Sequence, residues 1–211
     1  MTQPWIKICG ITQNKDADYA AQLGVNALGF VFYSKSPRSI SSKVLPKIIE
    51  NLKGSVSIVA LFVDPTKDEV SEVLDSGLID LIQFHGNESE EFCSSFDTPY
   101  MKALHIKDQF LPLSVFDKYS SARYLLLDTF SRKVSGGTGK TFDWSIARDA
   151  IEKTNREIIV AGGLNPINVE HVIKAINPFG VDVSSGVESA PGKKDMTKLD
   201  RFVREARSVR S

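Results

Sequence analysis

The chain has 211 residues, and its 26 lysines and arginines balance 26 aspartates and glutamates, so the formal net charge at pH 7 is zero. This balance argues against a nucleic-acid or membrane-surface partner recognised by bulk charge. No apolar stretch approaches the roughly 18 residues that a membrane span needs, and the N-terminus shows no basic segment followed by an apolar run, so we expect neither a membrane anchor nor a signal peptide.

The two cysteines, Cys9 and Cys93, lie far apart in the sequence. Such sparse cysteine usage favours a reducing cytoplasm over a disulfide-stabilised fold. The three histidines show no metal-ligand spacing with either cysteine, so no metal site is predicted.

Short apolar runs alternate along the chain with amphipathic stretches, a pattern typical of strands that alternate with helices. The runs predict strands at residues 5–9, 27–32, 57–63, 78–84, 100–105, 123–128, 157–161 and 181–184. The stretches between them predict helices at residues 15–23, 43–52, 67–74, 89–95, 113–118, 144–153, 166–175 and 196–207. We expect Asn14, Asp143 and Asn165 to cap three of these helices, and Pro166 to open the seventh.

Eight strand-helix units of this kind predict a parallel sheet covered by helices. At this length they favour a compact α/β fold of the (β/α)8 TIM-barrel type, with residues 1–211 as one domain. The alternative is an open, doubly wound sheet. Its dinucleotide-binding version is disfavoured because no Gly-x-Gly-x-x-Gly follows the first strand.

In a (β/α)8 barrel the active site lies at the carboxyl ends of the strands, so the strand ends predict the site residues. These ends and the loops that follow them contain Cys9, Arg38, His85, Asp128, Gly162, Gly163, Asp182, Ser184, Ser185 and Gly186. We expect them to converge on one mouth.

The first strand places Trp5, Lys7 and Cys9 on one face, because side chains alternate between the two faces of a strand. Cys9 is either a small buried hydrophobe or a reactive thiol, and Lys7 either pairs with a buried acid or tunes the site. Asp128 follows three leucines, where desolvation would raise its pKa, although it could also cap a turn. A thiolate base and a carboxylic acid together suit a proton-transfer reaction such as an isomerisation.

The loops after the seventh and eighth strands favour phosphate binding over two ordinary turns. Gly162 and Gly163 let a ligand approach the backbone, and 184–186 offers amides and hydroxyls in the neighbouring loop. Asp182 could bind a sugar hydroxyl or neutralise Lys7.

Three other features have two possible interpretations. Arg38 suits a carboxylate but could be solvated, and His85 contacts a ligand or is structural. The glycine-rich segment 129–141 is interpreted as a lid rather than a nucleotide loop, because it lacks the full spacing of such a loop. Cys93 is expected to pack inside its helix.

Several motifs in order resemble the phosphoribosylanthranilate isomerase family. The matching segments are Lys7-Ile8-Cys9-Gly10-Ile11-Thr12, Ala27-Leu28-Gly29-Phe30-Val31-Phe32, Ser36-Pro37-Arg38, Gln83-Phe84-His85-Gly86, Leu127-Asp128-Thr129, 136–140, Ala161-Gly162-Gly163-Leu164 and Asp182-Val183-Ser184-Ser185-Gly186-Val187-Glu188. Phe84 departs from the leucine that is frequent in the family, without touching the proposed chemistry.

The resemblance implies an Amadori rearrangement in tryptophan biosynthesis, with Cys9 as general base and Asp128 as general acid. It implies that Arg38 faces the anthranilate carboxylate and that Asp182 contacts the sugar. It also implies that Gly163, Ser185 and Gly186 help to hold the phosphate of a small phosphorylated sugar-anthranilate substrate. No cofactor is implied, and either a monomer or a homodimer is compatible.

Two rival functions remain. The first is the histidine-pathway sugar isomerase, whose two-aspartate site disagrees with Cys9. The second is a phosphate-binding barrel without catalysis, which would not need Cys9 and Asp128 together.

Overall fold

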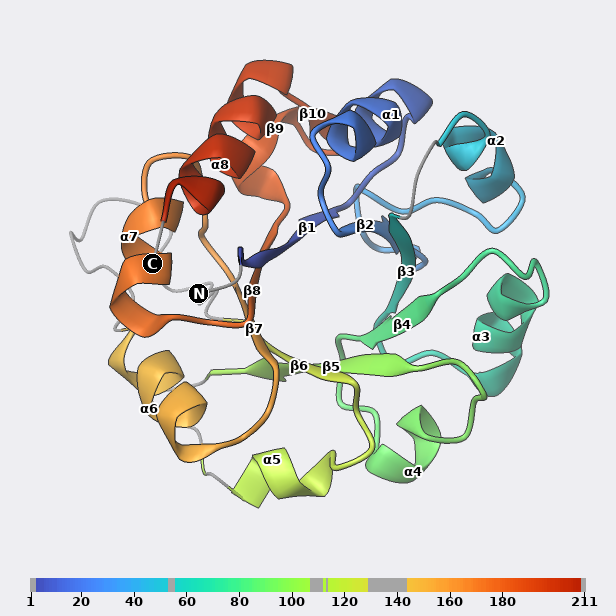
Figure 1. The fold of residues 1–211 in the computed structure, drawn as a ribbon. Coiled ribbons are helices and arrows are strands. Elements are labelled where there is room, and N and C mark those ends of the chain that lie inside the picture. Colours follow the sequence, from blue (N-terminus) through green and yellow to red (C-terminus); the bar gives the residue numbers. More distant parts are fainter. Residues whose placement is uncertain (1–2, 53–55, 107–111, 113, 129–143, 210–211) are drawn as a thin grey trace.

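The computed structural model describes residues 3–52, 56–106, 112, 114–128 and 144–209. Its eight parallel strands follow one another in sequence order around a closed barrel, and β8 pairs with β1 to complete the ring (Figure 1). The strands are β1 (Trp5–Cys9), β2 (Ala27–Val31), β3 (Ser57–Phe62), β4 (Leu81–Phe84), β5 (Tyr100–His105), β6 (Tyr124–Asp128), β7 (Ile158–Ala161) and β8 (Gly180–Val183). The (β/α)8 prediction is therefore confirmed.

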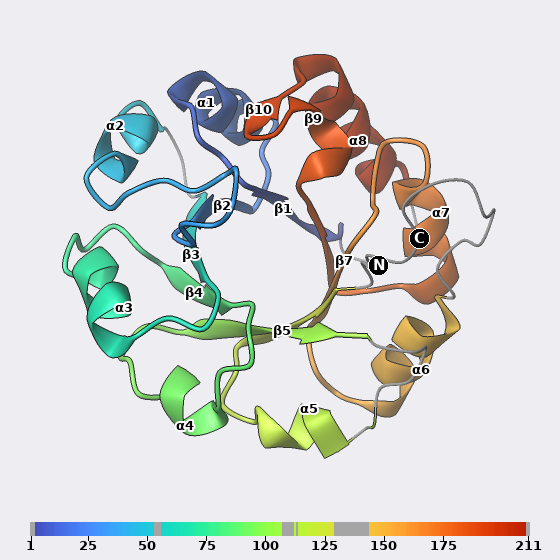
Figure 2. The ribbon, with the colours of Figure 1, turned by 180° about the vertical axis from the view of Figure 1, so that it is seen from behind.

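Helices surround the strands, as the views from opposite sides in Figures 1 and 2 show. They are α1 (Asn14–Gln22), α2 (Leu45–Ile49), α3 (Lys67–Leu74), α4 (Glu90–Cys93), α5 (Ser114–Lys118), α6 (Ser145–Lys153), α7 (Val169–Ile176) and α8 (Met196–Ser208). A short 3-10 helix, η2 (Ser185–Val187), and an antiparallel pair, β9 (Glu188–Ala190) and β10 (Lys193–Lys194), follow β8. The pattern of apolar residues did not predict this pair.

The alternation along each strand divides the core into two parts. On β1, Ile6 and Ile8 pack in the large apolar layer between the strands and the helices. Residues of the opposite parity face the barrel axis, where a second cluster lies around Val59, Met101 and Leu126. Because Ile6 and Ile8 occupy the outer face, Lys7 and Cys9 face the barrel axis, as the alternation predicts.

Some predicted boundaries were wrong by a few residues. β4 begins at Leu81 rather than at residue 78, and α1 is preceded by Gln13 at its N-cap rather than by Asn14. α7 begins at Val169, not at Pro166. The delay has a local cause: the Asn165 side-chain oxygen accepts a hydrogen bond from the amide of Ile167 at 2.8 Å, which holds a turn before the helix.

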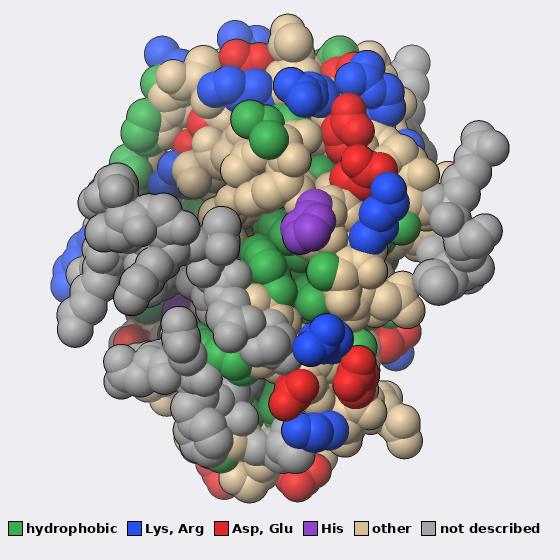
Figure 3. All heavy atoms as spheres, turned by 90° about the vertical axis from the view of Figure 1, so that its left-hand side faces the viewer, with side chains coloured by type: hydrophobic (Ala, Val, Ile, Leu, Met, Phe, Trp, Pro, Cys, Tyr) green, Lys and Arg blue, Asp and Glu red, His purple; other side chains and the backbone are tan. Residues whose placement is uncertain are grey.

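Within the described ranges no helix is long and apolar enough to cross a membrane. The face that includes α7 shows basic and acidic side chains interspersed, without a broad patch of one sign (Figure 3). This surface agrees with the zero net charge of the chain.

Candidate active site

Cys9 ends β1 and is 6% exposed, packed beside Val31 and Leu61. Its neighbour in the sheet register is Gly29 on β2. A Cβ atom at that glycine would lie 2.9 Å from the Cys9 sulfur. The absence of a side chain on Gly29 therefore makes room for the thiol inside the barrel.

Lys7 and Asp182 form an ion pair inside the barrel. The two residues are register neighbours on β1 and β8, and Lys7 Nζ lies 3.0 Å from Asp182 Oδ1. Burial lowers the pKa of Lys7, but the charge of Asp182 and its hydrogen bond outweigh this, so the pKa lies above its ordinary value. The structure thus shows that Asp182 neutralises Lys7, one of the two roles that the sequence left open.

Burial also raises the pKa of the Cys9 thiol. The positive charges of Lys7 and Lys194 favour the thiolate, while the carboxylate of Asp182 opposes it. Because burial outweighs the two lysines, the thiol form of Cys9 is favoured at neutral pH. The charge of Lys7 stabilises the Cys9 thiolate, as predicted, but the pKa of Cys9 still lies above its ordinary value.

Lys194, on β10, joins the loops around β1 and β8. Its buried ammonium donates to the carbonyl oxygens of Cys9, at 2.6 Å, and Ser184, at 3.2 Å, and to Glu188 Oε1 at 2.9 Å. Burial lowers the pKa of Lys194. Lys194 and Glu188 were not among the predicted site residues, because they lie after the eighth strand in a short antiparallel pair that the apolar pattern does not mark.

Arg38, in the loop after β2, also binds Glu188. Its Nε and Nη2 donate to the two carboxylate oxygens at 2.8 and 2.6 Å, a two-pronged contact. Burial opposes ionisation of Glu188, but the hydrogen bonds from Arg38 and Lys194 outweigh it and hold the pKa of that carboxyl below its ordinary value. Arg38 is therefore oriented by an acid across the barrel mouth rather than free in solvent.

The loops after β7 and β8 touch each other. Gly162 and Gly163 have φ values of 88° and 68°, the left-handed region that favours glycine. A Cβ atom at Gly186 in η2 would overlap the carbonyl oxygen of Leu164, whereas one at Gly163 would meet nothing within 4 Å. The predicted phosphate-binding glycines therefore meet at one place, where Gly163 borders open space. Ser184 and Ser185, at the N-cap and first residue of η2, lie beside them.

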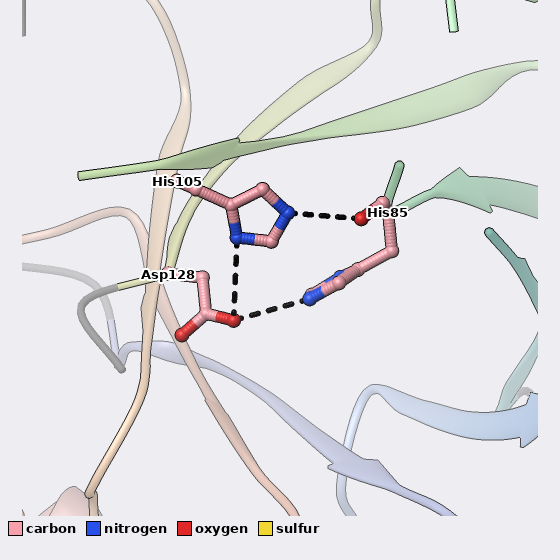
Figure 4. A group of neighbouring side chains, drawn as sticks. All are labelled: His85, His105 and Asp128. Carbon is pink, nitrogen blue, oxygen red and sulfur yellow. Dashed lines mark hydrogen bonds and ion pairs between the residues drawn. The ribbon is translucent and has the colours of Figure 1, made fainter. Parts of the chain in front are cut away.

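Asp128 ends β6 and contacts two histidines, His85 just after β4 and His105 at the end of β5 (Figure 4). Its Oδ2 lies 3.1 Å from His85 Nε2 and 3.8 Å from His105 Nδ1. His85 Nδ1 in turn lies 2.9 Å from Gln83 Nε2. Both ring nitrogens of His85 thus have protein partners, which favours the structural interpretation of this residue.

His105 was not among the predicted site residues. It is the register neighbour of Asp128 on β5, and its ring meets that of His85 edge-on at 5.0 Å. His105 ends β5 and has the same parity as the inward-facing Met101 and Ala103, and this is the signal that could have identified it. His85, His105 and Asp128 form a group whose ligand atoms lie within 4.8 Å of one another, close enough to hold a metal ion.

Cys93 packs in the outer layer, as predicted, and burial raises its pKa to about 12. The expected lid, residues 129–141, and the expected helix cap Asp143 lie outside the described residues.

Comparisons with known proteins agree on one family. Residues 6–205 match the family model of N-(5'phosphoribosyl)anthranilate (PRA) isomerase. Over 199 residues the chain is 43% identical to the N-(5'-phosphoribosyl)anthranilate isomerase of Legionella pneumophila (strain Paris), which covers 94% of this chain and 95% of the relative.

Solved structures of this family have the same fold. The phosphoribosyl anthranilate isomerase of Thermotoga maritima is 36% identical with a TM-score of 0.86, covering 98% of this chain and 100% of that one. A phosphoribosyl anthranilate isomerase in complex with reduced 1-(o-carboxyphenylamino)-1-deoxyribulose 5-phosphate is 34% identical with a TM-score of 0.81, covering 98% and 100%.

Proposed function

The chain belongs to the N-(5'-phosphoribosyl)anthranilate isomerase family, and from this premise we propose that Cys9 is the general base and Asp128 the general acid of its reaction. The protein is an isomerase of tryptophan biosynthesis. The observation that carries the proposal is the position of both residues. They lie at the carboxyl ends of β1 and β6, on the inward face of one closed barrel and at the same rim. The substrate in this proposal is N-(5'-phosphoribosyl)anthranilate, and the product is 1-(o-carboxyphenylamino)-1-deoxyribulose 5-phosphate.

The first step opens the sugar ring. Asp128 in its protonated form donates its proton to the ring oxygen, and the bond between that oxygen and C1' breaks. The lone pair of the anthranilate nitrogen forms the C1'=N double bond of a Schiff base. The contacts of Asp128 with His85 and His105 support this role, because they orient the carboxyl group at the barrel mouth.

The second step removes a proton from C2'. The Cys9 thiolate accepts this proton, and the electron pair forms a C1'=C2' double bond, which neutralises the nitrogen. The resulting enolamine loses its hydroxyl proton and gains one at C1' to give the amino ketone. Lys7 and Lys194 support this step, because their positive charges stabilise the thiolate.

The remaining site residues bind the substrate in this proposal. Gly162, Gly163, Ser184, Ser185 and Gly186 hold the phosphate, since the two glycine-containing loops meet beside open space.

Other residues orient the rest of the substrate. Arg38 binds the anthranilate carboxylate through the edge of its guanidinium that Glu188 does not occupy. Asp182 contacts the sugar while it holds Lys7, and His85 acts by orienting Asp128. The reaction requires no cofactor. A cytoplasmic location and a monomeric or homodimeric state remain predictions.

Loss of substrate fluorescence tests the proposed roles, because the anthranilate-bearing substrate is fluorescent and turnover would quench it. We expect Cys9→Ala and Asp128→Asn each to lower kcat by about 100-fold or more, while both variants still bind the reduced product. Cys93→Ala is the matched control, since Cys93 is also buried but lies in the outer layer on α4. Near-normal turnover in the Cys9 or Asp128 variant would refute the assignment.

A further inference from the structure

Three potential metal ligands meet where β4, β5 and β6 end (Figure 4). His85 Nε2 and Asp128 Oδ2 are 3.1 Å apart, and His105 Nδ1 lies 3.8 Å from the same oxygen. Around a tetrahedral zinc ion with bonds of about 2.0 Å, neighbouring ligand atoms are about 3.3 Å apart. The first pair is already near that separation, and a small rotation of the His105 ring would bring the second pair to it.

The hydrogen bond made by His105 Nε2 leaves the lone pair of Nδ1 available to a metal ion. His105 Nε2 lies 2.9 Å from the backbone oxygen of His85. Because a carbonyl oxygen only accepts, Nε2 carries the proton, and in the neutral ring Nδ1 presents its lone pair toward Asp128. Metal-binding histidines in proteins are usually oriented by such a bond from their other ring nitrogen to a carbonyl or carboxylate.

Gln83 provides a corresponding partner for His85. Its side chain is fully buried, its Nε2 lies 2.9 Å from His85 Nδ1, and its Oε1 makes no hydrogen bond within the described part of the chain. Rotation of the Gln83 amide by 180° would place its Oε1 beside His85 Nδ1, which would then carry the ring proton and donate it to that oxygen. His85 Nε2 would then present its lone pair toward Asp128. This rotation satisfies the buried oxygen and prepares His85 as a ligand.

The group is partly exposed: the side chains of His105, His85 and Asp128 are 38%, 22% and 16% exposed. Two imidazoles and one carboxylate suit Zn²⁺ and neighbouring transition metals, whereas Mg²⁺ and Ca²⁺ prefer oxygen ligands throughout.

We propose that His85, His105 and Asp128 bind one Zn²⁺ ion, and that the bound ion inhibits the isomerase. The inhibitory half rests on the proposed function, because a carboxylate that ligates Zn²⁺ cannot carry the proton to the sugar ring oxygen. The binding half rests on the ligand geometry alone. The site thus lets a transition metal compete with the proton for Asp128.

The experiment measures metal binding and turnover separately. Zn²⁺ affinity is measured on the folded protein by competition with a chromophoric chelator, and Co²⁺ is added as a spectroscopic probe of the ligands. The test variant is His105→Gln, whose side-chain amide can still donate to the His85 carbonyl but lacks the imidazole Nδ1. The matched control is His171→Gln, because His171 is exposed on α7 and lies outside the group. Inhibition is expressed relative to the metal-free rate of each variant.

We expect wild type and the His171 variant to bind one Zn²⁺ and to lose turnover in parallel with binding. The His105 variant should bind at least 10-fold more weakly, and its inhibition should need correspondingly more Zn²⁺. The Co²⁺ spectrum should lack a thiolate charge-transfer band. Equal affinity in wild type and the His105 variant, or a thiolate band from Cys9, would overturn the site.

Full turnover with Zn²⁺ bound would overturn the inhibition. The proposed acid role of Asp128 is tested independently by Asp128→Asn without metal, so failure of either proposal can be distinguished from failure of the other.

Discussion

We expect the ion pair between Lys7 and Asp182 to contribute to the folding stability of the barrel. Lys7 is fully buried and its ammonium lies 3.0 Å from the carboxylate of Asp182. Lys7→Met keeps much of the side-chain volume but leaves Asp182 as an uncompensated charge inside the barrel. Removal of one partner of a buried pair typically costs about 3–5 kcal/mol of folding free energy.

The double variant Lys7→Met/Asp182→Asn separates the cost of the unpaired charge from the loss of packing. It leaves no net charge in the barrel, so we expect it to recover most of the stability that Lys7→Met loses. The two positions are register neighbours in direct contact, so their effects should be strongly non-additive.

The assay is urea unfolding followed by circular dichroism, with Lys153→Met as the control. Lys153 pairs with Asp149 on the exposed surface of α6, so its loss should leave the midpoint nearly unchanged. If the double variant is no more stable than Lys7→Met, the barrel tolerates the lone Asp182 carboxylate and our reasoning about the pair is wrong.

Other predictions concern binding and pH. Gly186→Ala should separate its loop from Leu164 and raise KM by about tenfold, the equivalent of one lost phosphate hydrogen bond of about 1.5 kcal/mol; an unchanged KM would argue against the phosphate site. The pKa of Glu188 is lowered in the folded protein, so its contribution to stability is present above its unfolded pKa of about 4.3 and is lost as pH falls through the folded value. Glu188→Gln should therefore remove that part of the acid sensitivity in urea unfolding, and equally steep acid dependence in both proteins would contradict this. Since burial raises the pKa of Cys9, kcat/KM of wild type should keep rising with pH above the ordinary thiol value of about 8.5, whereas a limb near neutral pH would show that the lysines outweigh burial.

Much of the barrel could be predicted from local patterns. The period of two on the first strand placed Lys7 and Cys9 on the same face, opposite Ile6 and Ile8. Boundaries were less predictable, because short polar side chains compete locally with the helix: Asn165 holds a turn that delays α7 by three residues.

The candidate site was predictable where it coincided with strand ends. Cys9 and Asp128 follow apolar runs, and the rule for parallel barrels turns such positions into candidates. Glu188 and Lys194 were assigned no role because β9 and β10 are too short for a periodic signal to indicate which way a side chain points.

Local residue patterns specify the eightfold alternation of strand and helix, and with it the parity that turns Lys7, Cys9 and Asp128 toward one axis. Which groups meet at that axis depends on how the barrel closes. Lys7 and Asp182 are 175 residues apart and become neighbours because β8 closes the ring onto β1. Likewise, His105 approaches Asp128 because the β5–β6 register aligns their ends. Barrel closure and strand register depend on the packing of the whole core, so no local pattern specifies these contacts.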